Sequence, residues 1–408
     1  LSIIWLGQAL YGPAKAAIGL WLLRRQRRLY AQGVDRRAPV ALIISAKGAG
    51  DLFPRFLELV SRQDYPSYRL LFVTESANDP ARLAMKEFLK LPDGEDHWTR
   101  PDKGSGLQEV DLLVAGFAEV TGQKVFNQLA AFEKLRDEDE IIAFADSDIL
   151  GGEDWLEQLA MPLNRGDGEL STGYRWFVPE TDSLANIVAT NINSAIATMN
   201  GPSWHTLLWG GSMAIHRSCF EDMDVPRLLR GSLNDDLQIS AEARRRRKRI
   251  RFVRSLFAPS PVNYSWGSLL EFARRQYFQV WTYVPHFWFT AAFFTTSWVV
   301  ACVWNWVALI NGNWWSAGVI GTVFLLNLIR SALRKPHLRA LFPEETRMRL
   351  RAARRWEWAT DWLNHSFHCV AVFSPLFLKE LTWAGIRYRV RGRQEVKVLE
   401  RDGLLESS

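Results

Sequence analysis

Residues 141–149 read Ile141-Ile-Ala-Phe-Ala-Asp-Ser-Asp-Ile149, an apolar run that ends in two carboxylates. Its apolar residues fall on both faces of an extended chain, which is typical of a central strand in an α/β sheet. Open α/β sheets bind ligands beyond the carboxyl ends of their strands. We therefore predict that Asp146 and Asp148 stand at a ligand site, where two carboxylates can bind one divalent cation. The alternative is an ordinary turn, because short Asp-x-Asp runs are common in turns.

The composition indicates a protein with one part in water and another part in or on a membrane. Its 408 residues exceed one ordinary domain, and its 19 Trp and 23 Phe exceed the needs of a soluble core. The net charge of +6 comes from arginine clusters beside apolar segments, which favours an anionic membrane surface and argues against nucleic acid. The three Cys lie far apart without metal-ligand spacing, so they indicate neither a zinc site nor a disulfide framework.

Residues 38–265 have the pattern of an α/β domain. A strand at Val40–Ile44 precedes a Gly-rich loop and an amphipathic helix, and Lys47 in that loop is predicted to face a nucleotide. A second strand ends just before Glu75 and Asp79, which are candidate contacts to the base and ribose. Asp79 precedes Pro80, so a helix cap is the alternative for its carboxylate.

Two further segments of this domain carry candidate ligand contacts. Lys124 and Asn127 are three residues apart on one face of a helix that follows a glycine turn. Trp204 and His205 are candidate sugar contacts, although a lone His is more often structural.

Two pairs of charged residues suggest the chemistry. Asp235 and Asp236 open an amphipathic helix whose N-terminus favours ionised carboxylates, so one can act as a base while the other caps the helix. Arg274 and Arg275 can bind a departing diphosphate, or can belong to an interfacial helix of arginine and aromatic residues.

The remaining chain predicts a membrane-bound layout. The segment Arg334–Trp356 carries eight Lys/Arg and two Glu, which places it in the cytoplasm by the positive-inside rule. A spanning helix at the N-terminus has an interfacial helix as its alternative, because Lys15 would lie within the bilayer. The predicted segments are an N-terminal transmembrane helix with a basic flank (1–28), the catalytic domain (38–265), an interfacial helix (266–283), a transmembrane hairpin (284–333), a basic loop with a re-entrant or interfacial helix (334–383) and a cytosolic tail (384–408).

Together these motifs resemble the ceramide glucosyltransferase family and its bacterial relatives, which are membrane-bound inverting enzymes with a cytosolic GT-A domain. That family closes its site with a Gln/Arg-x-x-Arg-Trp motif, whereas here Glu271-Phe-Ala-Arg-Arg275 supplies the arginine and the tryptophan comes later. The resemblance runs from Val40 to Trp281. The matching positions are Lys47, Asp79, Lys124, Asn127, Asp146, Asp148 and Asp236.

The resemblance implies a fold, a donor and roles for these residues. It implies an α/β, Rossmann-like GT-A domain that binds a UDP-sugar, with transmembrane and interfacial helices beside it. Asp236 would be the general base, Arg274 and Arg275 would stabilise the leaving diphosphate, and Asp148 with Asp146 would bind Mg²⁺ or Mn²⁺. The donor contacts would be Lys47, Glu75, Asp79, Lys124, Asn127, Asp146, Gln276 and Trp281.

The implied reaction is transfer of a hexose, glucose in the first place, to a membrane lipid such as ceramide. Transfer of N-acetylglucosamine to a phospholipid headgroup and of glucose to diacylglycerol are alternatives. A membrane scaffold that binds a nucleotide sugar without turnover is an alternative of another class. The tail Trp383-Ala-Gly-Ile-Arg-Tyr-Arg389 resembles bacterial lipid glycosyltransferases, which suggests a bacterial inner membrane, and the alternation that begins at Ile386 predicts a short strand.

Overall fold

The computed structural model describes residues 1–408 except 103, 150, 200, 202–204 and 402–408. The chain forms two compact units, and each is described by itself. The sheet unit comprises Gln32–Tyr174, Gly201–Ala258 and Leu378–Ser408, and the helical unit comprises Leu1–Ala31, Arg175–Asn200 and Pro259–Phe377. The predicted domain 38–265 is thus divided, because residues 175–200 and 259–265 pack with the helices.

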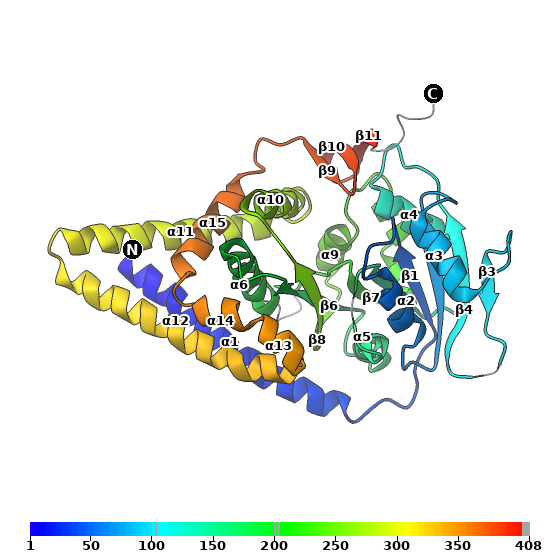
Figure 1. The fold of residues 1–408 in the computed structure, drawn as a ribbon, viewed down its shortest axis with the longest axis horizontal. Helices are drawn as coiled ribbons and strands as arrows, with labels where there is room; N and C mark the ends of the chain where they lie inside the picture. Colours follow the sequence, from blue (N-terminus) through cyan, green and yellow to red (C-terminus); the bar gives the residue numbers. More distant parts are fainter. Residues whose placement is uncertain (103, 150, 200, 202–204, 402–408) are drawn as a thin grey trace. The chain divides into compact units, whose positions relative to one another are not determined.

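An eight-stranded sheet organises the sheet unit, in the order β3-β4-β2-β1-β5-β7-β6-β8 (Figure 1). Strands β4, β2, β1 and β5 run parallel, while β3 and β7 are antiparallel to their neighbours β4 and β5. Strands β6 and β8 continue into the helical unit. The strands are β1 Val40–Ser45, β2 Ser67–Thr74, β3 His97–Thr99, β4 Gly106–Val114, β5 Ile141–Asp146, β6 Leu170–Pro179, β7 Ser212–His216 and β8 Ile250–Val262.

Apolar side chains on the two faces of this sheet explain its helical cover. On one face Val125 and Phe132 of α4 pack with Ile43 and Phe144 of the sheet in a buried cluster that also includes side chains of α7, α8 and α9. Phe53 of α2 contacts Phe72 of β2, with ring centroids 6.2 Å apart. The helices of this unit are α2 Phe53–Ser61, α3 Pro80–Leu89, α4 Gln123–Phe132, α5 Trp155–Asn164, α7 Arg217–Asp222, α8 Val225–Leu229 and α9 Asp236–Arg245.

A second, three-stranded sheet near the C-terminus belongs to the same unit. Its order is β11-β10-β9, and all its pairs are antiparallel. The predicted strand after Ile386 is present as β10. The Gln394 side chain donates to three main-chain carbonyls of residues 227–230, and the Val398 N–H donates to Glu119 O at 2.7 Å. These strands are β9 Glu380–Trp383, β10 Ile386–Gly392 and β11 Glu395–Arg401.

Three long helices dominate the helical unit (Figure 1). Trp5 and Ala9 of α1 share a buried cluster with Trp298 of α11 and Val319 of α12. The Lys15 ammonium donates to Met199 O at 2.8 Å at the end of α6, so this cation in an otherwise apolar stretch has a hydrogen-bond acceptor. The helices are α1 Ser2–Tyr30, α6 Leu184–Met199, α10 Trp266–Tyr283, α11 Pro285–Ile310, α12 Trp314–Leu341, α13 Glu344–Arg349, α14 Arg351–Trp356 and α15 Asp361–Phe373.

Helices α11 and α12 are those in the described part of the chain that are long and apolar enough to cross a membrane. Only 22% and 28% of their most apolar windows are buried, unlike the core helix of a soluble protein. The hairpin predicted at 284–333 therefore has its two helices, but α12 continues to Leu341 because Arg334 and His337 are buried within the unit. The predicted α/β class, with long apolar helices in addition to the sheet domain, is confirmed.

Candidate active site

The carboxyl ends of β1 and β5 form the switch point of the sheet. From β1 the chain proceeds to β2 and β4 on one side, and then returns to place β5 on the other side. Ser45 ends β1 and is aligned with Asp146, which ends β5. Open α/β sheets bind ligands at such a point, because the loops diverge there and leave a crevice. Asp146 therefore lies at the expected ligand edge.

Lys124 links carboxylates from two other elements at this edge. It lies in the first turn of α4, and its Nζ is 2.7 Å from Asp146 Oδ1 and 3.2 Å from Asp235 Oδ2. Burial alone would lower the pKa of Lys124, but the three carboxylates of Asp146, Asp235 and Asp236 raise it. The ammonium therefore stays charged and neutralises part of the acidic cluster.

Asp235 is the buried member of the aspartate pair. Its side chain is 2% exposed, and its Oδ2 accepts a hydrogen bond of 2.6 Å from Gln128 Nε2. Burial alone would raise the pKa of Asp235, whereas the Lys124 ammonium and the Gln128 amide lower it. Asp235 thus stays ionised as a structural anion.

Asp236 is the member with the properties of a base. It is only partly buried, and its Oδ2 accepts a hydrogen bond of 2.6 Å from the Gly210 N–H. Burial and the neighbouring charge of Asp235 raise the pKa of Asp236 to about 6. The cap expected from one of the two aspartates comes instead from Asn234, whose Oδ1 accepts from the Leu237 N–H at 2.7 Å.

Two adjacent glycines bring the backbone against this cluster. A Cβ on Gly210 would lie 2.9 Å from both Asp235 Oδ2 and Lys124 Nζ, and one on Gly211 would lie 2.8 Å from Asp146 Oδ2. Such distances are shorter than carbon and polar atoms tolerate, so only glycine fits here.

Gly210→Ala is expected to displace Lys124 or Asp235, at a cost in stability of about 1–3 kcal/mol, with a loss of turnover. Thermal unfolding and an assay with labelled donor measure the two effects. Gly50→Ala is the matched control, because a Cβ on Gly50 meets no atom within 4 Å. If the two variants behave alike, close packing at Gly210 is unimportant.

The residues predicted on the nucleotide side lie at the ends of β1 and β2. Asp79 caps α3 by accepting from the Ala81 N–H at 2.8 Å, and the same oxygen accepts from the Gly48 N–H at 3.0 Å. Lys47 forms an ion pair of 3.0 Å with Glu75. Asp79 therefore caps α3, as the alternative predicted. Its carboxylate also fixes the loop that carries Lys47, through the hydrogen bond from Gly48.

Arg401 is a residue of this edge that the sequence did not reveal. Arg401 ends β11, and its side chain is 8% exposed. Its Nη1 lies 3.0 Å from Glu75 Oε2, while the other oxygen of the same carboxylate, Oε1, pairs with Lys47. Its Nη2 donates to Ala118 O at 2.7 Å and to Gln123 Oε1 at 2.6 Å. A separation of 326 residues hides this pair from any local pattern.

Arg401→Gln is expected to raise the KM for the donor about tenfold, with a smaller change in kcat, because Glu75 and Lys47 lose their support. Steady-state kinetics with a varied concentration of the predicted donor measure both constants. Arg391→Gln, an exposed arginine on β10, is the matched control. An unchanged KM would show that the C-terminal sheet does not position the donor edge.

Asn127 and Asp148 differ in their surroundings. Asn127 is buried, and its Oδ1 accepts from Gln123 Nε2 at 2.8 Å, so its amide helps to hold α4 in place. Asp148 is exposed just beyond β5. Asp146 Oδ1 accepts from Lys124 Nζ at 2.7 Å. Carboxylate oxygens suit Mg²⁺ and Mn²⁺, so the binding of a divalent cation by Asp146 and Asp148 stays a prediction. Trp204, the candidate sugar contact beside His205, lies outside the described residues.

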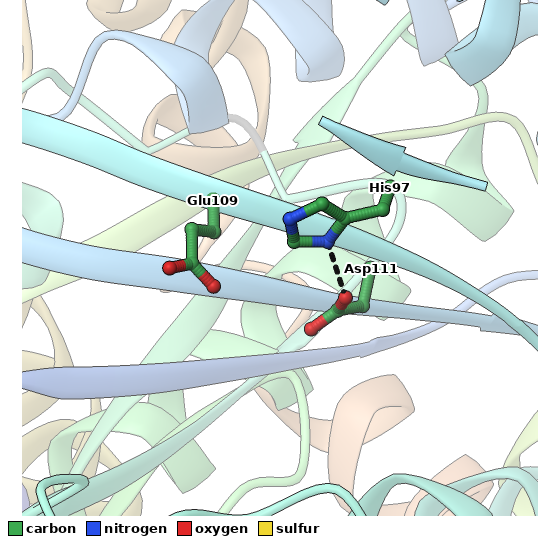
Figure 2. A group of neighbouring side chains, drawn as sticks. All are labelled: His97, Glu109 and Asp111. Carbon is green, nitrogen blue, oxygen red and sulfur yellow. Dashed lines mark hydrogen bonds and ion pairs between the residues drawn. The ribbon is translucent and has the colours of Figure 1, made fainter. Parts of the chain in front are cut away.

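Figure 2 shows His97, Glu109 and Asp111, three side chains in the described part of the chain whose ligand atoms lie close enough together to hold a metal ion. His97 Nδ1 lies 2.7 Å from Asp111 Oδ1, while Arg69 and Arg136 pair with Asp111 and Glu109 at 3.2 and 2.7 Å. The hydrogen bond from Arg136 lowers the pKa of Glu109. These carboxylates are neutralised by arginine and stand within β4 before its carboxyl end, so we do not assign the donor metal to them.

The predicted arginines lie on α10 of the helical unit. Arg275 and Arg175 stack on the same Phe272 ring, with guanidinium carbons 5.6 and 5.2 Å from its centroid. Burial, and then the charge of Arg175, lowers the pKa of Arg275. Arg274 Nε is buried without a hydrogen-bond partner among the described residues. Two neighbouring guanidinium groups of this kind suit an anion, and Arg175 was not recognised from the sequence.

Gln276 and Trp281 follow on the same helix. Gln276 is partly buried. Trp281 is 38% exposed, and its ring makes edge contacts with Trp288 and Phe289 at 4.9 and 5.7 Å. Trp281 therefore lies in an aromatic cluster at the junction of α10 and α11, and its contact with a donor stays a prediction.

Comparison with known proteins gives one match over nearly the whole chain, to the family model described as glycosyl transferase family 21, over residues 5–396. No curated protein matches the sequence. Among solved structures, mannosyltransferase PcManGT from Pyrobaculum calidifontis, in complex with GDP-Man and Mn²⁺, is similar with a TM-score of 0.46 and 12% identity over 92% of this chain and 99% of that chain. S. aureus TarS 1–349, in complex with UDP-GlcNAc, has a TM-score of 0.37 and 12% identity over 90% and 100% of the two chains.

Proposed function

Because the chain belongs to glycosyl transferase family 21, we propose that it transfers a hexose from a UDP-sugar to a membrane lipid with inversion at the anomeric carbon. The family match confirms the resemblance to the ceramide glucosyltransferase family at the level of the family, and supports a nucleotide-sugar donor. The hexose, the lipid and the bacterial inner membrane are our proposals.

The single observation that carries the mechanism is the different environment of two adjacent aspartates. Lys124 and Gln128 hold Asp235 as an anion, and burial together with this neighbouring charge raises the pKa of Asp236. A carboxylate with a pKa of about 6 is ionised at neutral pH and is still a stronger base than an ordinary aspartate. We therefore assign general base catalysis to Asp236, with the Gly210 N–H fixing its orientation.

In the proposed reaction the acceptor hydroxyl oxygen forms a bond with the anomeric carbon as the bond from that carbon to the UDP oxygen breaks. The hydroxyl proton passes to Asp236, and the bonding electrons leave with UDP. One displacement inverts the configuration, so no covalent nucleophile is needed. Arg274 and Arg275 are proposed to stabilise the leaving diphosphate.

Asp148 and Asp146 are proposed to hold Mg²⁺ or Mn²⁺, which when bound would neutralise charge on the diphosphate. Lys124 would orient Asp146 for this role through its contact of 2.7 Å. The donor contacts proposed for Lys47, Glu75, Asp79 and Asn127 are supported by their positions at the ends of β1 and β2 and on α4.

The membrane part of the proposal is supported by the apolar helices. We propose that α11 and α12 cross the membrane and that the catalytic domain faces the cytosol, because α13 and α14, which follow α12, are rich in arginine. A catalytic domain joined to such a hairpin can take an acceptor that never leaves the bilayer.

The base assignment predicts the pH dependence of turnover. Protonation of Asp236 removes the base, so kcat should be level above about pH 7 and fall about tenfold per unit well below pH 6. Asp235→Asn removes the charge that helps to raise this pKa, so its profile should shift to lower pH. A profile of kcat against pH for both proteins measures this. If the midpoints of the two profiles coincide, the charge of Asp235 does not raise the pKa of Asp236.

The acceptor is tested with purified protein in detergent, labelled UDP-glucose or UDP-N-acetylglucosamine, and ceramide, diacylglycerol or phosphatidylethanolamine supplied separately. Labelled glucosylceramide is the expected product. Label on phosphatidylethanolamine or diacylglycerol alone would refute the ceramide proposal and leave lipid glycosylation standing. Donor binding without any transfer to these lipids would favour the scaffold alternative.

A further inference from the structure

A cavity of about 300 Å³ in the helical unit lies between α12 and the α14 region. It is separate from the residues assigned to donor binding and catalysis above. Its walls combine apolar and cationic side chains. They are Leu328, Ser331, Ala332, Lys335, Arg351, Arg354, Arg355 and Trp358.

Four of the eight lining residues carry a positive charge. Among the described residues, no carboxylate forms an ion pair with Lys335, Arg351, Arg354 or Arg355. Arg355 instead lies over the Trp356 ring, with its guanidinium carbon 5.7 Å from the centroid. A small cavity with four such cations has a strong electrostatic preference for an anion.

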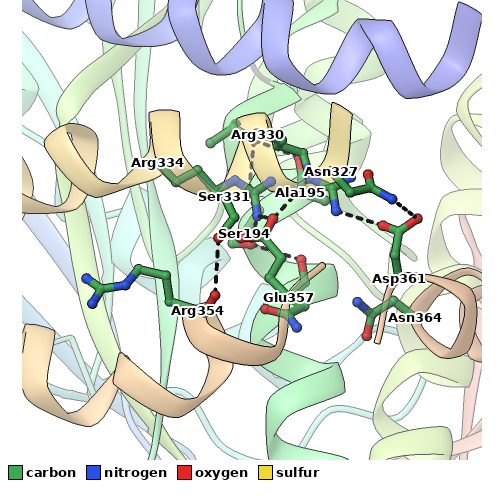
Figure 3. A network of polar contacts seen from close by, with 12 residues as sticks. Ser194, Ala195, Asn327, Arg330, Ser331, Arg334, Arg354, Glu357, Asp361 and Asn364 are labelled. Atoms are coloured by element: carbon green, nitrogen blue, oxygen red, sulfur yellow. Dashed lines mark hydrogen bonds and ion pairs between the residues drawn. The ribbon is translucent and has the colours of Figure 1, made fainter. Parts of the chain in front are cut away.

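Figure 3 shows why nearby carboxylates do not neutralise these cations. Glu357 Oε1 accepts from Arg330 at 3.1 Å and also pairs with Arg334. Asp361 accepts from Arg330 at 2.7 Å and from Asn327 at 3.1 Å. These pairs are buried and attach α12 to the chain around α14 and α15. Glu357 and Asp361 are therefore occupied by buried partners, and neither carboxylate neutralises the cations that line the cavity.

The wall of the cavity is held by the same packing. Ser331 Oγ donates to Arg354 O at 3.2 Å, which joins α12 to α14 directly (Figure 3). The Trp358 ring makes an edge contact with Phe324, at a centroid distance of 4.7 Å. The cationic groups are thus presented by a preformed wall.

The apolar side of the cavity continues along the exposed surface of α12. Leu328, Ala332 and Lys335 follow one another at helical spacing, so one stripe of α12 changes from apolar to cationic at the cavity. The neighbouring Phe324, Leu325 and Leu328 are 44%, 56% and 38% exposed. A ligand that matches this surface has an anionic head and a long apolar tail.

We propose that this cavity binds the headgroup phosphate of an anionic membrane phospholipid, with its acyl chains along the exposed apolar face of α12. This inference rests on the proposed membrane insertion of α11 and α12. The lipid would be a bound component that holds α12 and α14 together at the membrane surface, distinct from the glycosyl acceptor.

The test uses the full chain in neutral detergent, titrated with phosphatidylglycerol or phosphatidylcholine while bound lipid is counted by native mass spectrometry. Wild-type protein should prefer phosphatidylglycerol. Lys335→Gln/Arg354→Gln should weaken its binding about 10- to 30-fold, since each surface cation contributes about fivefold. Arg339→Gln, an exposed cation on α12 that does not line the cavity, should bind like wild type.

Three outcomes would overturn the proposal. They are unchanged phosphatidylglycerol binding by the double variant, an equal loss in Arg339→Gln, and full displacement of the lipid by millimolar inorganic phosphate, which would indicate a site for a small anion. Equal melting temperatures of the lipid-free proteins establish that the variants are folded. Flotation with pure phosphatidylcholine vesicles tests membrane insertion separately, so a failure of the anionic site is distinguishable from a failure of the membrane proposal.

Discussion

Asp236→Asn is expected to lower turnover about 10²–10⁴-fold while leaving the affinity for UDP close to that of wild type. The amide keeps the shape of the side chain and its oxygen can still accept from the Gly210 N–H, so the fold around α9 should survive. The amide cannot take the proton of the acceptor hydroxyl at neutral pH. The measurements are single-turnover transfer with labelled donor and calorimetric titration with UDP.

Asp137→Asn is the matched control, because Asp137 is an exposed carboxylate of the same unit outside the cluster. Turnover of Asp236→Asn within a few-fold of wild type would remove Asp236 from the mechanism. If UDP binding were lost together with turnover, the carboxylate would have to be assigned to the donor site instead.

Lys124→Met is expected to destabilise the fold by about 3–5 kcal/mol, the largest effect on stability among the variants considered. Methionine fills similar space but leaves Asp235 buried without its cation, and Asp146 loses its contact of 2.7 Å. The loss should depend on pH. In wild type the pKa of Asp235 is lowered, so its contribution is present above the unfolded pKa of 3.8 and is lost as the pH falls.

In Lys124→Met the burial of Asp235 is no longer opposed by the ammonium, so its pKa should rise and the variant should recover stability on acidification. The difference in melting temperature from wild type should therefore be larger at pH 8 than at pH 5.

The double variant Lys124→Met/Asp235→Asn is the control. The amide that replaces the Asp235 carboxylate is neutral and can donate to Gln128 Oε1, which has no hydrogen-bond partner among the described residues. The double variant should recover much of the lost stability at pH 8. If it is less stable than Lys124→Met, the ion pair is not the source of the effect.

The fold class and the sheet edge that carries the candidate site could be predicted from local sequence patterns. The apolar runs before Ser45, Glu75 and Asp146 predicted the three central parallel strands, because a strand buried on both faces needs apolar residues at every position. Carboxylates that follow such strands must lie at one edge of the sheet. The long apolar helix α11 could also be predicted, since length and hydropathy are local properties of the sequence.

Strand β4 was harder to predict because polar and apolar residues are mixed along it. Strand β8 likewise has no continuous apolar run. Residues 384–408 were expected to be a tail, yet the described part of this segment, up to Arg401, belongs to the sheet unit. That outcome depends on surface complementarity between distant segments, which a local pattern does not contain.

Only the tertiary structure decided how the two adjacent aspartates differ. The sequence left the base and the cap open between Asp235 and Asp236. Folding gives the cap to Asn234, buries Asp235 against Lys124 and Gln128, and places Asp236 on the Gly210 N–H. The contact of Asp235 with Gln128 and that of Asp236 with Gly210 join residues 107 and 26 positions apart in the sequence. The physical reason is that burial and Coulomb interactions set a pKa through space, so the chemistry of a carboxylate is fixed by its neighbours in the fold.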